Sequence, residues 1–159
     1  MKTLIKVAAA LVLSVAGLAA SLAHDYTVGD LVIKHPWARP TVTDRTPGAA
    51  YFVVHNTGEE ADRLVAVHPD PAFAGRAELH THLFDDGVAR MRRVDGGILI
   101  PAGETVALEP GGLHVMLYEL TGPLEVGVLR KLTLEFEHSG SVDVWVLVQS
   151  PDMDAAHAH

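Results

Sequence analysis

Short apolar segments separated by turn-forming residues run through most of the chain. The clearest covers residues 131–137, where Leu132, Leu134 and Phe136 alternate with polar residues. A period of two places the apolar side chains on one face of a β-strand and the polar ones on the other. By the same criterion, strands are predicted at residues 28–34, 49–55, 64–67, 78–83, 88–94, 98–101, 105–108, 113–120, 131–137 and 142–149.

Glycine, proline, asparagine and aspartate cluster between these segments, as in Asn56-Thr57-Gly58, Asp85-Asp86-Gly87 and Pro110-Gly111-Gly112. Such residues favour tight turns because they tolerate or preset the required backbone angles. No stretch of the mature chain has a helical period. Many short strands at this spacing predict an all-β antiparallel sandwich or barrel.

The first residues have the pattern of a secretory signal peptide. Lys2 and Lys6 precede an apolar run over residues 7–20, and small residues Ser21 and Ala23 follow at the −3 and −1 positions of a cleavage site. The run is short for a membrane span of about 20 residues. We therefore expect export and cleavage after Ala23, with cleavage after Ser21 as the alternative.

Three parts follow from this assignment. Residues 1–23 are expected to be the signal peptide, residues 24–150 one β-sandwich domain, and residues 151–159 a flexible tail that contains histidine and methionine. No later segment is apolar enough to cross a bilayer. The sequence therefore predicts a soluble, exported protein with no membrane span after signal cleavage.

The charge balance and the lack of cysteine exclude several classes of function. The chain has a formal net charge of −8, and cleavage would remove two lysines and leave 10 basic against 20 acidic residues. A chain with this excess of acidic residues is poorly suited to binding nucleic acid, because the phosphate backbone is also negatively charged. Because there is no cysteine, blue-copper, thiolate–zinc, iron–sulfur and thiol-exchange chemistry are excluded.

Histidine and methionine recur at strand spacing in three predicted strands. His80 and His82 share one face of a strand, Met91 lies on the next, and His114 and Met116 share one face of a later strand. Methionine normally packs inward, so a His–Met pair directed away from the core is unusual. We expect the side chains of His114 and Met116 to point outward.

These side chains suit Cu(I). Thioether sulfur is a soft ligand and imidazole a borderline one, whereas Zn(II) and Mg(II) gain little from thioether. Thioethers also cannot form disulfides in an oxidising compartment. On the residues alone, ordinary packing of the two methionines remains an equal alternative.

The spacing His80-x10-Met91-x22-His114-x-Met116 resembles that of the periplasmic copper chaperones of the PCuAC family. The neighbouring segments HPWARPT, AAYFVVHNTG, AELHTH and IPAGETVALEPGGLHVML are similar to the family as well. The likeness extends from Tyr26 to about Ser150. It departs from the family in one extra residue between Met91 and His114, and in His82, where relatives often have methionine.

The resemblance implies a cupredoxin-like antiparallel β-sandwich of Greek-key type. It implies that His80, Met91, His114 and Met116 bind Cu(I), and that the copper is delivered to the dinuclear copper centre of cytochrome c oxidase. The expected partners are the copper-bearing subunit of that oxidase and Sco-type proteins. Under this hypothesis the protein is not an enzyme.

Further candidate copper ligands lie outside this set of four. His82 is an auxiliary ligand or a bystander. Some relatives bind Cu(II) with a C-terminal tail, to which Met153, His157 and His159 are similar. Cleavage after Ala23 would make His24 the N-terminal residue, whose amine and imidazole can chelate Cu(II). Chance histidines in the tail and a frayed N-terminus are the alternatives.

Two other classes of function stay open. A copper oxidoreductase could use an N-terminal His24, which would require a second histidine near it in space and oxygen-dependent turnover. A β-sandwich without metal could act as an interaction module, which would bind no Cu(I) in competition with a chelator.

Overall fold

The computed structural model describes residues 24–152, so the predicted signal peptide and the tail residues Met153, His157 and His159 lie outside it. Within this range no helix is long and apolar enough to cross a bilayer. The eleven strands are β1 (Tyr26–Val28), β2 (Leu31–Ala38), β3 (Gly48–Asn56), β4 (Asp62–Pro69), β5 (Ala74–Asp85), β6 (Val88–Arg93), β7 (Ile98–Ile100), β8 (Thr105–Leu108), β9 (His114–Leu120), β10 (Leu129–Phe136) and β11 (Gly140–Val148).

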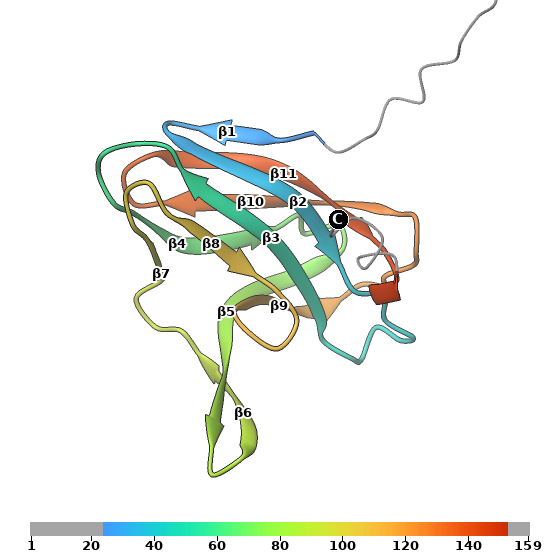
Figure 1. The fold of residues 1–159 in the computed structure, drawn as a ribbon. Helices are drawn as coiled ribbons and strands as arrows, with labels where there is room; N and C mark the ends of the chain where they lie inside the picture. Colours follow the sequence, from blue (N-terminus) through green and yellow to red (C-terminus); the bar gives the residue numbers. More distant parts are fainter. Residues whose placement is uncertain (1–23, 153–159) are drawn as a thin grey trace, which may run out of the picture.

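The strands form one hydrogen-bonded sheet in the order β6-β5-β9-β3-β2-β11-β10-β4-β7, which folds over on itself. β1 pairs with β2, and β8 pairs with β3. Figure 1 shows β2, β3, β10 and β11 crossing the body, while the hairpin of β5 and β6 projects away from it. The predicted all-β, cupredoxin-like sandwich is confirmed, with one difference: β11 and β2 are parallel.

The core lies between the layers and is built from alternating positions. On β10, Leu132, Leu134 and Phe136 are buried, as the period of two predicted. Val115 and Leu117 of β9 contribute from the side of the molecule that holds the histidines and methionines. Because successive residues of a strand point to opposite faces, burying these two sends His114 and Met116 to the other face.

The N-terminal strands differ from the prediction. The segment predicted as one strand is divided by a turn at Gly29 and Asp30, and Gly29 adopts a φ of +55°, which glycine tolerates without a Cβ clash. β2 then continues through Pro36 to Ala38. A register shift between Lys34 and Trp37 accommodates this proline, because a bulge removes the need for its missing N–H group.

Two adjacent glycines give a matched test of the packing between β4 and the loop before β7. Gly96 and Gly97 have nearly the same φ, +84° and +83°, but a Cβ on Gly97 would clash with the carbonyl oxygen of Leu64, whereas one on Gly96 would meet nothing within 4 Å. Gly96→Ala should therefore cost only the backbone strain of about 1–2 kcal/mol. Gly97→Ala should lower the free energy of unfolding by about 1–3 kcal/mol more.

Urea denaturation of the two variants measures this difference. Equal destabilisation would contradict the close approach of Gly97 to Leu64.

Candidate metal centre

A tight turn fixes the register of the β5–β6 hairpin. Asp86 and Gly87 both have positive φ, 49° and 78°, as a two-residue type I′ turn requires. The turn sets Met91 directly opposite His82. A slip of one residue would move Met91 to the other face of the hairpin.

The pairing of β5 with β9 brings the remaining candidates together. His80 lies directly opposite His114, and Glu78 lies opposite Met116. All these side chains share one face of the sheet, because the residues on each strand are two apart. The core side chains Leu79 and Val115 occupy the other face.

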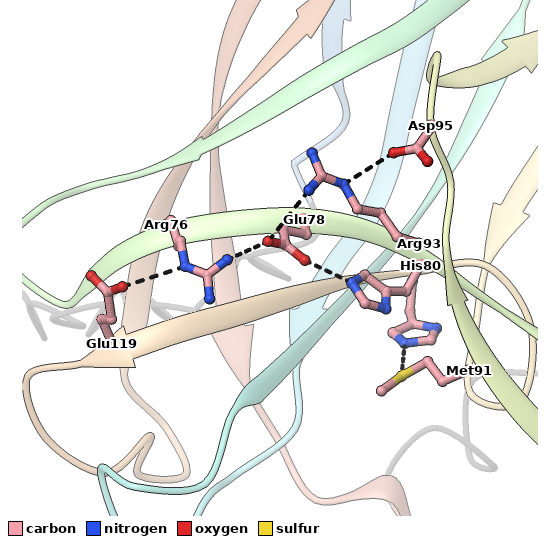
Figure 2. A network of polar contacts seen from close by, with 8 residues as sticks. Arg76, Glu78, His80, Met91, Arg93, Asp95 and Glu119 are labelled. Atoms are coloured by element: carbon pink, nitrogen blue, oxygen red, sulfur yellow. Dashed lines mark hydrogen bonds and ion pairs between the residues drawn. The ribbon is translucent and has the colours of Figure 1, made fainter.

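Four of the candidate side chains lie close together, centred on His114. The Nε2 atom of His114 lies 3.1 Å from the Sδ atom of Met91. The ring centroid of His114 is 5.9 Å from that of His80 and 5.0 Å from that of His82. Figure 2 shows His80 linked to Glu78, with Met91 at the edge of the same group of polar residues. Met116 lies on the same face of β9 as His114, opposite Glu78, and is half-buried.

The expectation that His114 points outward into solvent is wrong. His114 is only 4% exposed and His80 8%, although both lie on the face opposite the core. The β5–β6 hairpin carries Met91 and His82 next to the ring of His114, and the ring of His80 lies beside those of His114 and Tyr118. Met91 itself is 46% exposed, so the cluster combines shielded imidazoles with an accessible thioether.

The state of His114 follows from its surroundings. Its Nδ1–H donates to the carbonyl oxygen of Gly112 at 2.9 Å, which leaves the lone pair of the neutral ring on Nε2, facing Met91. Burial lowers the pKa of His114, and the nearby His82 and His80 lower it further, against the opposing effect of the Gly112 hydrogen bond. The neutral ring needed for metal binding is thus favoured.

The carboxylate of Glu78, which the sequence analysis did not identify, accepts a hydrogen bond from His80. The Nε2–H group of His80 donates to Glu78 Oε2 at 3.0 Å, and Glu78 in turn accepts from Arg76 and lies 3.8 Å from Arg93. The hydrogen bond from His80 lowers the pKa of Glu78, burial opposes this, and the two arginines add to the lowering. The sequence spacing could have identified this residue, because Glu78 precedes His80 by two positions and therefore lies on the same face of the strand.

The donor set matches a soft metal ion. No group of three or more His, Cys, Asp or Glu side chains within residues 24–152 is arranged to hold a metal. A metal at this place would therefore depend on thioether sulfur as well as imidazole. That combination suits Cu(I) and gives little to Zn(II).

Comparison with known proteins identifies the family. The family model described as "Putative lipoprotein LpqE-like" matches residues 31–148. The chain belongs to this LpqE-like family. Uncharacterized protein RP573 of Rickettsia prowazekii (strain Madrid E) is 34% identical over 105 residues, which are 64% of this chain and 57% of that protein. The chain thus spans less than two thirds of the length of this relative.

Two solved structures have a fold similar to that of this chain. The copper-bound PCuAC domain from PmoF2 is 31% identical, with a TM-score of 0.67, over 80% of this chain and 99% of that domain. The solution structure of CuI-DR1885 from Deinococcus radiodurans is 26% identical, with a TM-score of 0.56, over 84% of each chain. The predicted membership of the PCuAC family is confirmed.

The remaining histidines of this PCuAC protein differ in their relation to the cluster. Exposed His24 precedes β1. His82 is part of the cluster through its ring contact with His114. His55 bonds to Thr105 at 2.8 Å, and His68 bonds to Glu135 at 2.7 Å. These last two histidines therefore have structural partners away from the cluster.

A cleft of about 370 Å³ lies between β4, β5 and the loop that follows β6. Glu78 and Arg93 line it, whereas His80, Met91 and His114 do not. The carboxylate network therefore separates the cleft from the donor cluster of the PCuAC domain.

Proposed function

We propose that this PCuAC protein is an exported copper chaperone of the periplasm and not an enzyme. It binds Cu(I) through His80, Met91, His114 and Met116. It delivers the ion toward the dinuclear copper centre of cytochrome c oxidase, with the copper-bearing subunit and Sco-type proteins as partners.

The contact between His114 and Met91 carries this proposal. Because Gly112 accepts the Nδ1 proton of His114, the lone pair on Nε2 faces the sulfur lone pairs of Met91 at 3.1 Å. Two electron-pair donors directed at each other repel unless a proton or a Lewis acid lies between them. A soft cation such as Cu(I) is preferred by the thioether sulfur and is also bound by imidazole.

The compared proteins support the cargo and the location. One is a PCuAC domain with copper bound, and another is described with CuI. The family description names a lipoprotein, which is an exported class of protein, and export is also what the signal-peptide pattern of residues 1–23 predicts. Neutral ligands hold copper without a charge pair, so a partner with similar donors can remove it.

The exposure of the cluster supports transfer rather than storage. The sulfur-bearing side chain of Met91 is 46% exposed, while the imidazoles are shielded. An incoming ligand could replace the thioether first, because it is the accessible donor. Copper would then pass through a shared intermediate and never be free in solution.

Titration of the metal-free protein with Cu(I) against a colorimetric chelator, without oxygen, tests the proposal. We expect one Cu(I) per chain, retained in an excess of Zn(II). Met91→Leu should weaken binding by at least about 10-fold, since it removes a ligand while keeping an apolar side chain of similar size.

Leu83→Ala is the matched control, because Leu83 is also exposed on the hairpin but on its opposite face. It should bind Cu(I) as the original chain does. Absence of competitive Cu(I) uptake by the unaltered protein would refute the copper function. If the protein bound Cu(I) but did not transfer it to a copper-free oxidase subunit, only the proposed delivery would be refuted.

A further inference from the structure

The two central histidines offer different nitrogen atoms to the donor cluster. His114 uses Nδ1–H for its bond to Gly112 and leaves Nε2 free to bind. His80 does the reverse, because its Nε2 atom bonds to Glu78. A carboxylate can only accept, so Nε2 of a neutral His80 carries the hydrogen and Nδ1 carries the lone pair.

The Nδ1 atom of His80 has no other use in the fold. It is buried, and no residue of the described chain forms a hydrogen bond with it. Buried polar atoms are nearly always paired, and an exception needs a physical explanation, of which a role in binding an ion is one. The ring that bears this atom lies 5.9 Å, centroid to centroid, from that of His114.

Glu78 is itself held in place. Its side chain is 17% exposed, Arg76 donates to its Oε1 atom, and Arg93 Nη1 lies 3.8 Å from the same atom. Arg76 is tied to Glu119 at 3.3 Å, and Arg93 to Asp95 at 3.2 Å. Figure 2 shows this chain of charges extending from Glu119 and Asp95 to His80.

We propose that Glu78, anchored by Arg76 and Arg93, is a positioning residue that fixes the Nε2–H tautomer of His80 and thereby presents Nδ1 as its copper-binding nitrogen. This inference rests on the proposed function for the identity of the metal. A carboxylate behind a metal-binding histidine orients the ring and increases its basicity. Here the carboxylate also selects which nitrogen binds.

The tautomers are measurable without metal. Long-range ¹H–¹⁵N correlation spectra of the ¹⁵N-labelled metal-free protein, above the pKa of its histidines, should show His80 as the Nε2–H form and His114 as the Nδ1–H form. Glu78→Leu should turn His80 into a tautomer mixture and weaken Cu(I) binding about 10- to 100-fold, as loss of such a carboxylate does in other metal sites.

Glu78→Gln separates positioning from charge and from folding. Its amide oxygen can still accept the Nε2–H of His80, so the tautomer and most of the Cu(I) affinity should be retained. Glu135→Leu is the matched control, because Glu135 bonds to His68 in the same way on β10. It should change the tautomer of His68 and leave copper binding unaltered.

An Nδ1–H form of His80 in the metal-free protein would overturn the inference. So would unchanged Cu(I) affinity in a folded Glu78→Leu variant. If the unaltered protein bound no Cu(I), the proposed function would fail, yet the tautomer of His80 would still decide whether Glu78 positions the ring.

Discussion

Replacing His114 with alanine is expected to lower the affinity for Cu(I) by more than about 100-fold, beyond the range seen when only an outer carboxylate is lost. The substitution removes the Nε2 donor that faces Met91 at 3.1 Å. It also removes the ring that lies between His80 and His82 in the cluster. Competition with a colorimetric Cu(I) chelator measures the effect.

The same variant should be less stable, because His114 is 4% exposed and bonds to Gly112. We expect a loss of about 1–3 kcal/mol, from the cavity and from the unpaired carbonyl oxygen. The Cu(I) affinities of this variant and of the original chain must therefore be compared below the temperature at which the variant unfolds. His55→Ala, which removes a half-buried ring bonded to Thr105 away from the cluster, should keep full Cu(I) affinity. A folded His114→Ala variant with unchanged affinity would eliminate the assigned site.

Replacing Asp62 with alanine should destabilise the fold by about 3–5 kcal/mol, the largest stability effect that we expect. This carboxylate is 4% exposed at the start of β4. It accepts hydrogen bonds from the backbone N–H groups of Arg63, His138 and Ser139, at 2.7, 3.0 and 2.9 Å. Alanine would leave these donors without a partner. Urea denaturation near pH 6 measures the loss, and Asp143→Ala, at an exposed carboxylate bonded to Thr133, is the control.

The effect of Asp62 should depend on pH in a defined direction. Burial alone would raise its pKa, but hydrogen bonds from Ser139, His138 and Arg63 outweigh burial and hold the pKa below its ordinary value. The folded-state pKa is therefore lower than the unfolded one, which is about 3.9. The stabilisation is complete above that pH and is lost as the pH falls through the folded-state value. A stability difference between the original chain and Asp62→Asn that grew on acidification would contradict this account.

The strands were largely predictable from the sequence, because the pleat of a strand imposes a period of two on any sheet with one buried face. The segment over residues 131–137 illustrates this, since Leu132, Leu134 and Phe136 are all buried. The division at Gly29 and the passage of β2 through Pro36 were not predicted. Both depend on a local turn or bulge whose register is set by pairing with other strands.

The same period placed His114 with Met116 on one face, and His80 with His82 on another strand, before any contact was known. It could not show that His80 lies opposite His114, because strand order is a property of the folded sheet. Nor could it show that the rings are buried, which reversed the expected exposure of His114. Glu78 had the right spacing, but its role emerges only from the arginines that surround it.

The sequence by itself determined an all-β chain with a secretory pattern, no thiolate chemistry and a set of soft, neutral donors at strand spacing. Those properties are local, because they depend on side-chain type and on the two-residue repeat. The tertiary structure alone decided which donors meet, how far each is exposed and which nitrogen of each histidine is left to bind. These depend on pairing between distant segments, such as those of His80 and His114, which are 34 residues apart, and no local pattern fixes such pairing.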